Sequence, residues 1–378
     1  MITGSGDAGG SAKAAAIEEL LKPMKLPPLP PEPLASVLVA NYNYAAYIGE
    51  AIESVLGQTY QNFELVICDD GSTDNSCEVI GNYVQGDPRV KLIRKKNGGQ
   101  PSAMNAAYRG SRGDIICLLD SDDAFFRQKL ETVVEAFRED PMVGLVAHRE
   151  LRIDGRGRSH GITPLFSRLP SGWMGQDLLR NGGVVNLVST SGISLRREVA
   201  QRIFPLPEER ISGRGTVNMM GADTLIMRLA PLMSYVKSLH QPLAKYRFHG
   251  KSLTSAKKMN APFVEVCLAV WRAYYQAQRE YLASIDPRLA EALAPLDANV
   301  YVSEWEYMGA RFRGDPLTPQ LHTSLTHHRD FAHLPRSRRW FWKTSIFLPR
   351  PLFSWVVGQI FGGGGLRRVV ALVARGGK

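Results

Sequence analysis

The sequence predicts an α/β protein whose mostly parallel sheet is covered by helices on both faces. From Ser36 onward, short apolar or β-branched runs alternate with helix-period segments, as expected for strands that are buried in a parallel sheet. Polar clusters follow the strand-like runs, and in open α/β sheets ligands bind beyond the carboxyl ends of the strands. The 378 residues, 44% hydrophobic and 22% charged, are enough for one such domain with additions.

The regular alternation covers the first part of this region. In chain order, the predicted pairs of strand and helix are Val37–Ala40 with Ala46–Leu56, Leu65–Cys68 with Asn75–Val84, Val90–Arg94 with Pro101–Arg109, and Ile115–Leu119 with Gln128–Glu139. Beyond about residue 145 the pattern is less regular. There we expect a strand at Val143–His148 and helices at Gly172–Asn181, Met219–Ala230, Ala261–Leu282 and Leu289–Met308.

Composition divides the chain into several parts. Residues 1–35 open with Gly, Ser and Ala and contain six prolines between Pro23 and Pro33. This predicts a mobile leader, with a short helix at Ala12–Leu21, and a stiff extended linker. A main domain, a helical extension and a basic amphipathic tail are expected to follow at residues 36–255, 256–330 and 331–378.

Three carboxylates crowd the end of the strand-like run Ile115–Leu119, in the sequence Asp120-Ser121-Asp122-Asp123. Like charges this close repel and raise each other's pKa unless a positive charge lies between them. Hard divalent cations such as Mg²⁺ and Mn²⁺ take oxygen ligands and bridge to phosphates. The pattern therefore predicts a metal–diphosphate site at the carboxyl end of a strand. The alternative is a solvated acidic turn that caps the next helix.

The second strand-like run ends in Asp69-Asp70-Gly71-Ser72-Thr73-Asp74. Gly71 allows a tight turn, and Ser72 or Asp74 can cap the next helix. Asp70 is then expected to point into the crevice, where its carboxylate can accept a hydrogen bond from the imide N–H of a nucleobase. Helix capping alone would explain the later residues of this segment, but not its two leading aspartates.

The first and third strand-like runs end in polar, flexible segments. Asn41–Tyr44 places aromatic rings beside amides, which can stack on and hydrogen-bond a base, or can form a simple turn. No Gly-x-Gly-x-x-Gly pattern is present there, which disfavours a nicotinamide-dependent dehydrogenase. Asn97–Pro101 supplies glycines before a helix that carries Asn105, as suits close approach of a ligand. Lys95 and Lys96 can meet phosphate or remain solvated.

Four segments together resemble the family 2 inverting glycosyltransferases of GT-A fold: Ser36–Asn43, Tyr47–Tyr60, Phe63–Ser76 and Leu119–Asp123. The resemblance runs in order over residues 36–125 and continues more weakly to about residue 254. It implies a Rossmann-like sheet, with residues 36–125 as the nucleotide-binding half and residues 126–255 as the acceptor half. It also implies a divalent cation, Mn²⁺ or Mg²⁺, as cofactor.

The resemblance assigns roles to individual residues around the donor. Asp70 matches the aspartate that binds the donor's base. Asp120 and Asp122 match the Asp-x-Asp motif, with Asp122 as the direct metal ligand and Asp120 near the ribose or the sugar. Further donor-binding positions match at Ala40 and Tyr42, on the wall beside the base, and at Asn105, on a helix facing the donor.

The general base of the family is an aspartate that opens a helix, about a hundred residues past the Asp-x-Asp motif. Asp223, in Gly221–Leu229, resembles it in distance and context, although Ala222 replaces the residue that usually precedes it. The alternatives are that Asp223 only caps the helix, or that Glu208 or Glu209 is the base.

A later segment, Tyr246–Ser252, resembles the family's Tyr-Arg-x-His sequence. Its arginine, Arg247, could pair with the diphosphate through its planar guanidinium. Its histidine, His249, could complete the metal shell or could be structural.

The tail carries much of the net charge of +10, because no acidic residue follows Asp330. Arg336–Lys343 interleaves cations with Trp and Phe, and the apolar segments Ser345–Phe361 and Leu366–Ala374 follow. This favours in-plane attachment to an anionic membrane surface. The alternatives are packing on the main domain and binding a protein partner. Charge alone also permits nucleic-acid binding, but no nucleic-acid fold accompanies it, so none is expected.

Other features agree with a cytoplasmic protein that is peripheral to the membrane. The four cysteines lack paired metal spacing, and Cys68 and Cys117 lie in apolar runs, so buried thiols in a reducing compartment are expected. The first residues lack a signal-peptide pattern, and no apolar run is long enough to predict a spanning helix.

The resulting hypothesis is sugar transfer from a nucleotide-diphosphate sugar, expected to be a UDP-sugar, to a saccharide or lipid-linked saccharide in surface polysaccharide or glycoconjugate synthesis. Acceptor selection is expected within residues 150–222, including Trp173 and Ser189–Ser194. A sugar nucleotidyltransferase is one alternative, but it would need a Gly-rich loop with Lys or Arg after the first strand, and Asn41–Ala46 is not such a loop. A catalytically silent nucleotide- or glycan-binding module is the other.

Overall fold

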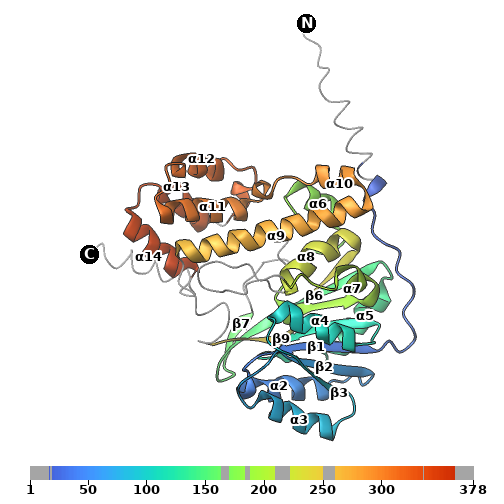
Figure 1. Cartoon of the computed structure of the whole chain (residues 1–378). Coiled ribbons are helices and arrows are strands. Elements are labelled where there is room, and N and C mark those ends of the chain that lie inside the picture. Colours follow the sequence, from blue (N-terminus) through green and yellow to red (C-terminus); the bar gives the residue numbers. More distant parts are fainter. Residues whose placement is uncertain are drawn as a thin grey trace.

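A computed structural model describes residues 17, 19–162, 170–183, 188–208, 222–249, 260–334 and 336–361. The described residues form one sheet of nine strands, in the order β3-β2-β1-β4-β8-β6-β9-β5, with β7 paired to β6. Helices cover both faces of the sheet, and a group of helices from the C-terminal part lies beyond one of these faces (Figure 1). The sheet is mixed but mostly parallel in its first half, which confirms the predicted fold class.

The first half consists of parallel strands that match the predicted ones and exceed several of them at their ends. The strands are β1 (Ala35–Asn41), β2 (Phe63–Asp69), β3 (Val90–Arg94) and β4 (Ile115–Asp120). The helices that follow them are α2 (Ala45–Leu56), α3 (Ser76–Gly86), α4 (Gln100–Gly110) and α5 (Lys129–Glu139). Every residue of β2 is buried, because both faces of the strand are covered.

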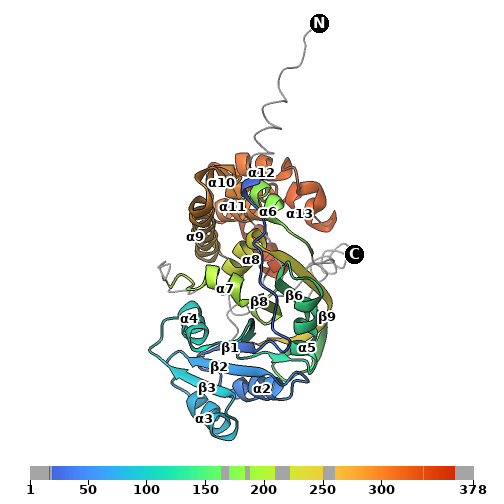
Figure 2. The ribbon, with the colours of Figure 1, turned by 90° about the vertical axis from the view of Figure 1, so that its right-hand side faces the viewer.

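Two hydrophobic clusters lie on opposite faces of the sheet. One cluster joins Val37 and Leu65 of the strands to the buried stripes of α2, α3 and α5. The other joins Leu38 and Val66 to α4 and to the later helices α7 (Arg197–Ile203) and α8 (Ala222–Met233). Figure 2 shows these two groups of helices on either side of the strands. The alternation of side chains along each strand thus fixes which helices cover which face.

The second half adds strands that the sequence analysis did not predict. They are β5 (Ala124–Phe125), β7 (Ser159–Ile162), β8 (Ile193–Arg196) and β9 (Tyr235–Phe248). The predicted strand at Val143–His148 is confirmed as the start of a longer one, β6 (Val143–Asp154). Strand β8 is antiparallel to both β4 and β6, whereas β9 is parallel to β6. This part of the sheet escaped prediction because β9 is only partly buried and carries charged and polar residues at many positions.

The helical predictions for the remaining chain are partly confirmed. The helix predicted at Gly172–Asn181 is only α6 (Gly175–Arg180), and α8 covers the described part of Met219–Ala230, whose first three residues lie outside the described structure. A single helix at Leu289–Met308 is wrong, because the chain breaks between α10 (Pro287–Ala292) and α11 (Val300–Arg313). Pro295 cannot donate a backbone hydrogen bond there, and the Asn299 side chain caps α11 by accepting from the Tyr301 N–H at 3.0 Å.

A long helix connects the sheet domain to the C-terminal helices. Helix α9 (Ala261–Ile285) contributes Tyr274 and Leu282 to the core above the sheet, and Val264 and Leu268 to a third hydrophobic cluster. That cluster contains the buried side chains Tyr307, Trp342 and Phe353. It is formed by α9, α11, α12 (Thr318–Thr326), α13 (Arg336–Ser345) and α14 (Arg350–Phe361).

The proline-rich segment before β1 runs along the domain surface in an extended form. Hydrogen bonds hold it at several points, including Met24 N–H to the Met233 carbonyl at 2.7 Å and the Tyr60 hydroxyl to the Pro33 carbonyl at 2.6 Å. Most of the predicted helix Ala12–Leu21, and all of the predicted tail segment Leu366–Ala374, lie outside the described residues. Among the helices that are described, none has both the length and the apolar character needed to cross a bilayer.

Candidate active site

The acidic turn after β4 meets the end of β9 at the carboxyl edge of the sheet. There Oδ2 of Asp122 lies 3.0 Å from Nε2 of His249, and both side chains are largely buried. The backbone N–H of Arg247 donates to Oδ1 of Asp123 at 2.7 Å, so β9 also holds the third acid of the turn. Two residues that lie far apart in the sequence, the predicted metal ligands Asp122 and His249, are therefore brought together.

The carboxyl groups of this turn are held where negative charge is unfavourable. Burial and the neighbouring Asp122 hold the pKa of Asp120 well above its usual range, and burial with repulsion from Asp122 and Asp120 does the same for Asp123. Burial also raises the pKa of Asp122, against the opposing effect of His249. A cation at this place would relieve these costs.

The donor set fits a divalent metal that is shared with a ligand. Asp122 offers a carboxylate oxygen and His249 an imidazole nitrogen, both of which Mn²⁺ accepts. Within the described ranges, no group of three or more His, Cys, Asp or Glu side chains is arranged to hold an ion alone. Such a metal would therefore need oxygen ligands from a bound molecule, as a diphosphate provides.

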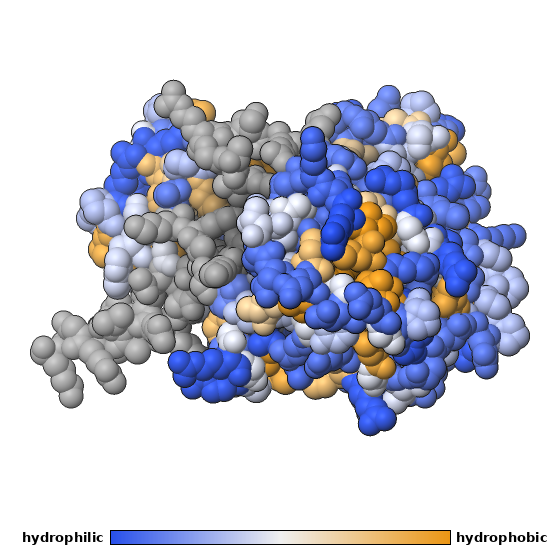
Figure 3. Space-filling view, turned by 60° about the horizontal axis from the view of Figure 1, so that its bottom comes forward, coloured by the Kyte–Doolittle hydropathy of each residue, from blue (hydrophilic) through white to orange (hydrophobic). Residues whose placement is uncertain are grey.

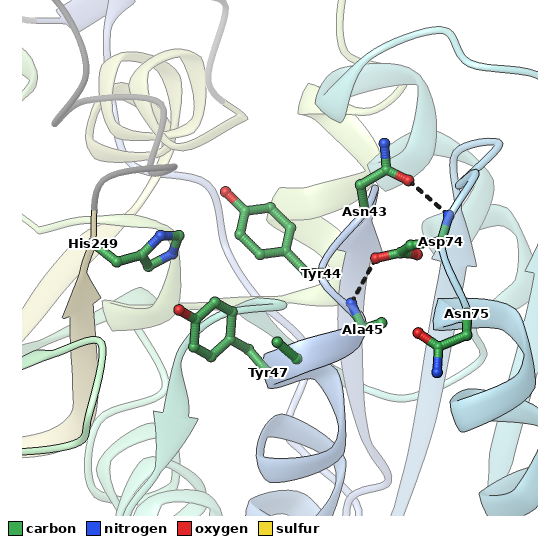
Figure 4. Close-up of a pocket in the computed structure, with 8 residues that line it drawn as sticks. Asn43, Tyr44, Ala45, Tyr47, Asp74, Asn75 and His249 are labelled. Carbon is green, nitrogen blue, oxygen red and sulfur yellow. Dashed lines mark hydrogen bonds between the residues drawn. The ribbon is translucent and has the colours of Figure 1, made fainter.

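A pocket of about 600 Å³ opens beside His249. The ring of Tyr47 stacks on the imidazole at a centroid distance of 4.8 Å, and the Tyr44 ring meets it edge-on at 5.8 Å. Figure 4 shows the two tyrosines between His249 and the two loops that carry Asn43 and Asp74. The pocket is lined by Asn43, Tyr44, Ala45, Ala46, Tyr47, Asp74, Asn75 and His249.

The loops after β1 and β2 brace each other on the far side of this pocket. The side-chain oxygen of Asn43 accepts from the Thr73 N–H at 2.7 Å and from the Asp74 N–H at 3.3 Å. Oδ2 of Asp74 accepts from the Ala45 N–H at 3.0 Å, and Figure 4 marks this bond and the one from Asp74 to Asn43. Asp74 also accepts from the Ser76 N–H at 3.0 Å, so it satisfies the first N–H groups of two helices, α2 and α3. The predicted capping role of Asp74 is confirmed and extends to α2.

The predicted base-binding aspartate ties the second polar loop to the third. The buried carboxylate of Asp70 accepts from the Lys95 ammonium at 2.7 Å and from the N–H groups of Gly98 and Gly99 at 3.0 and 2.6 Å. Gly71 has the positive φ of 80° that its predicted tight turn requires. The carboxylate of Asp70 is therefore engaged by Lys95 and the glycine loop, and its role in base binding stays a prediction.

The other predicted donor contacts have different surroundings. Ala40 is half-buried on β1 between Asp120 of β4 and Cys68 of β2, and Tyr42 is exposed just beyond the end of the strand. Asn105 is fully buried on α4, where its amide accepts from the Leu206 N–H at 2.7 Å and donates to the Leu206 carbonyl at 2.8 Å. In this structure the amide of Asn105 therefore anchors the segment after α7.

Two of the three carboxylates considered as the general base lie in the described structure. Glu208 accepts from Asn105 at 2.9 Å and from Ser102 at 2.8 Å, and these bonds lower its pKa. Asp223 lies in the first turn of α8, and burial raises its pKa, although its carboxylate accepts from the Thr224 N–H at 2.6 Å. Glu209 falls outside the described ranges.

Electrostatics connects Asp223 to the acidic turn. The charge of Asp223 adds to the rise in the pKa of Asp120, so the two carboxyl groups interact across the site. Burial raises the pKa of Tyr274 on α9, and the charge of Asp223 raises it further. A helix from outside the predicted main domain therefore helps to enclose Asp223.

Arg247 fixes the acidic turn against α2. Its Nε donates to the Asp122 carbonyl at 2.8 Å, and its Nη2 donates to the Glu50 carboxylate. The guanidinium also lies over the ring of Tyr47, 5.1 Å from its centroid. In this structure the guanidinium thus contacts protein groups, and diphosphate binding by Arg247 stays a prediction.

Comparison with known proteins places these residues in a family. Residues 36–204 match the family described as Glycosyl transferase family 2. Residues 36–204 form a family 2 glycosyltransferase domain. A Nostoc sp. protein described as an uncharacterized glycosyltransferase is 36% identical over 216 residues, which cover 57% of this chain and 65% of the relative. A chondroitin synthase of Pasteurella multocida is 40% identical over 139 residues, which cover 36% of this chain and 14% of that protein. The match thus spans less than two thirds of either relative.

Solved structures show that the fold is GT-A-like. S. aureus TarS 1–349, in complex with UDP-GlcNAc, has a TM-score of 0.53 at 19% identity and covers 90% of this chain and 92% of its own. The mannosyltransferase PcManGT from Pyrobaculum calidifontis, in complex with GDP-Man and Mn²⁺, has a TM-score of 0.51 at 16% identity, with 95% and 94% covered. Both similarities extend beyond the glycosyltransferase domain into the C-terminal helices.

Sequence reasoning did not identify a run of hydroxyl side chains beneath the acidic turn of the glycosyltransferase domain. The Ser189 hydroxyl donates to Glu150, and the Ser191 hydroxyl donates to Oδ2 of Asp123 at 2.6 Å. Between them, the Thr190 side chain forms a hydrogen bond with Asp120. Three consecutive residues thus each contact a different acid. Ser189–Ser194 was expected only to take part in acceptor selection.

Glu150 is the acid that the sequence analysis missed. It is 1% exposed on β6, and its charge contributes to the raised pKa values of Asp120 and Asp123. The available signal was its position two residues after the predicted strand Val143–His148. Extending that strand would have placed Glu150 at the carboxyl edge of the sheet, beside the other acids.

Glu150→Gln is expected to remove a pH-dependent loss of stability from the metal-free protein. Burial raises the pKa of Glu150 from its ordinary value of 4.5 to about 7. Its contribution to stability is therefore fully present below pH 4.5 and is lost as the pH rises through 7. Above that pH the variant should exceed the wild type in unfolding free energy by on the order of 3 kcal/mol, and near the ordinary pKa the two should agree.

Urea unfolding across this pH range, with EDTA present, measures the difference. Glu135→Gln is the matched control, because Glu135 is exposed on α5 and its substitution should not change the pH dependence. Equal pH dependence in wild type and Glu150→Gln would contradict the raised pKa of this buried carboxyl.

Proposed function

We propose that the protein transfers a sugar from a nucleotide-diphosphate sugar to a hydroxyl of a saccharide or lipid-linked saccharide. The observation that carries this proposal is the 3.0 Å contact between Asp122 and His249 at the carboxyl edge of the sheet. This contact joins the Asp-x-Asp motif to His249. Both Asp122 and Asp223 raise the pKa of the neighbouring Asp120 by their charge. Membership of residues 36–204 in glycosyltransferase family 2 supports the same reaction class.

Asp122 and His249 are proposed to hold Mn²⁺ or Mg²⁺ together with the donor diphosphate. The bound cation would supply positive charge against the negative charge that grows on the departing nucleoside diphosphate. The complex of PcManGT with GDP-Man and Mn²⁺ supports this assignment by its fold similarity. The raised pKa values of the three aspartates in the turn are the chain's own indication that positive charge is needed here.

Asp223 is proposed as the general base. Burial raises its pKa toward the range where a carboxylate can accept a proton at neutral pH. Its carboxylate would take the proton of the acceptor hydroxyl as that oxygen attacks the anomeric carbon from the side opposite the leaving group. The anomeric configuration would then be inverted.

The donor is proposed to lie along the loops that follow the first strands. Tyr42 and Ala40 would form the wall beside the base, and Asp70 would accept from the base imide, as a uracil ring provides. A UDP-sugar is favoured by the UDP-GlcNAc complex of TarS, whereas the GDP-Man complex of PcManGT marks the alternative nucleotide. Asp120 would lie near the ribose or the sugar, Asn105 would face the donor from α4, and Arg247 would lie near the diphosphate.

The acceptor is proposed to bind in the half formed by residues 126–255. The polysaccharide synthases among the relatives, for chondroitin and hyaluronan, support a saccharide acceptor in polymer or glycoconjugate synthesis. A lipid-linked acceptor would agree with a cytoplasmic protein that is peripheral to the membrane.

Product analysis tests the reaction class. Full-length protein incubated with nucleotide sugars, candidate saccharides and Mn²⁺ should give a glycoside and a nucleoside diphosphate, identified by mass spectrometry. A nucleotide sugar and pyrophosphate, formed from a sugar phosphate and a nucleoside triphosphate, would assign the protein to the nucleotidyltransferases instead. Bound nucleotide without any product under every condition would favour a silent binding module.

A further inference from the structure

Several large hydrophobic side chains are exposed within a short stretch of the last described helices. Trp340 is 69% exposed on α13, Phe347 is 84% exposed in the turn after it, and Leu352 and Trp355 on α14 are 45% and 46% exposed. These are four of the nine large hydrophobic residues that are exposed in the described structure, and they fall within sixteen consecutive positions. The other five are dispersed from residue 42 to residue 317.

The core of the C-terminal helices does not use these side chains. Helix α13 buries Phe341 and Trp342 on its inner side, and α14 buries Phe353 and Val357. Arg338 forms an ion pair of 2.5 Å with the buried carboxylate of Glu304, which fixes α13 on α11. The exposed aromatic side chains of α13 and α14 are therefore not needed for the packing of the C-terminal helices.

Basic residues lie close in sequence to these exposed side chains. Arg336 and Lys343 are exposed one turn to either side of Trp340, and Arg339 is half-exposed beside it. No Asp or Glu follows Asp330 in the sequence. The acids of neighbouring elements are engaged elsewhere, since Glu304 pairs with Arg338 and Asp315 with Arg313.

We propose that this aromatic–basic face docks on an anionic lipid bilayer. The face comprises Arg336, Arg339, Trp340, Lys343, Phe347, Leu352 and Trp355. Trp and Phe side chains enter the boundary between headgroups and acyl chains, while Arg and Lys remain at the level of anionic headgroups. A neutral protein groove would bury the aromatics but would leave the cations without partners, so charge complementarity selects the anionic bilayer.

Docking in this way is compatible with catalysis at the sheet edge. Helix α14 and the hairpin of β6 and β7, at the carboxyl edge of the sheet, lie toward the same side of the molecule (Figure 1). The space-filling view in Figure 3 shows a mostly hydrophilic surface around a hydrophobic area near its centre. The docking proposal does not depend on the identity of the reaction.

Co-sedimentation with vesicles tests the proposal on the full chain. Wild-type protein should sediment with vesicles of phosphatidylcholine and phosphatidylglycerol, and only weakly with phosphatidylcholine alone or in high salt. The variant Trp340→Ser/Phe347→Ser/Trp355→Ser should bind the mixed vesicles at least about tenfold more weakly. The variant Arg339→Gln/Lys343→Gln should lose part of the preference for the anionic lipid.

The matched control is Ile285→Ser/Leu317→Ser, which removes two exposed hydrophobic residues that do not belong to the face. It should bind as the wild type does, and circular dichroism should show that all variants are folded. Tryptophan fluorescence supplies a second measurement, since brominated lipid should quench the wild type but not Trp340→Phe/Trp355→Phe. Wild-type protein that does not bind anionic vesicles, or a triple variant that binds them like the wild type, would overturn the proposal. Vesicle binding without quenching would do so as well.

Discussion

Asp122→Ala is expected to abolish sugar transfer while the protein remains folded. The substitution removes the only carboxylate that the structure brings within 3.0 Å of His249 among the described residues, and with it the proposed bridge to the donor diphosphate. Loss of charge stabilisation on the leaving group should lower the rate by about a thousandfold or more. Steady-state release of nucleoside diphosphate measures the rate.

The fold of Asp122→Ala should survive, because burial already makes the charge of Asp122 unfavourable in the metal-free protein. Calorimetric titration with Mn²⁺ and a nucleoside diphosphate should show that the variant loses tight metal binding. Asp87→Ala is the matched control, because Asp87 pairs with Arg89 at the surface and its removal should leave transfer unchanged. Full activity of Asp122→Ala would refute the metal assignment.

Asp223→Asn is expected to retain donor binding and to lose transfer. The amide cannot accept the proton of the acceptor hydroxyl, and general-base catalysis contributes about a hundred- to ten-thousandfold to such reactions. The turnover number should fall by that factor, while the dissociation constant of the nucleotide sugar should stay near the wild-type value. Single-turnover kinetics together with equilibrium binding measures both.

The pH dependence gives a second test of the same residue. Only the ionised carboxylate of Asp223 can act as base, and burial raises its pKa, so the wild-type rate should be lost on acidification at a pH above the ordinary aspartate range. Glu208→Gln is the control, because hydrogen bonds to Asn105 and Ser102 hold Glu208 ionised and engaged at α4. Normal transfer by Asp223→Asn would show that another residue is the base.

The sequence predicted the structure of residues 36–125 more completely than that of residues 126–255, and the cause is the pattern of burial. The runs Leu65–Cys68 and Ile115–Leu119 are buried on both faces, so they read as continuous apolar segments. Strand β9 is partly exposed along much of its length and has no such signal. Its pairing with β6 is long-range and could be inferred only from tertiary structure.

In the candidate site, too, residues within local motifs could be predicted, whereas contacts between distant segments could not. Asp122 and His249 could be named from local motifs, and the structure brings them together. Other contacts at the site join segments that are far apart in the sequence, so no local sequence pattern predicts them. Examples are the hydrogen bonds of Arg247 with Glu50 and of Asn105 with Leu206. Glu150 was missed for a simpler reason, since β6 continues past the point where its apolar character fades.

Release of nucleoside diphosphate, with and without EDTA, is the measurement that tests the central claim most directly. Purified full-length protein should release nucleoside diphosphate from one nucleotide sugar in the presence of Mn²⁺ or Mg²⁺ and a saccharide acceptor. EDTA should stop the release, and added metal should restore it. Release that continues unchanged in EDTA would contradict a metal–diphosphate site at Asp122 and His249.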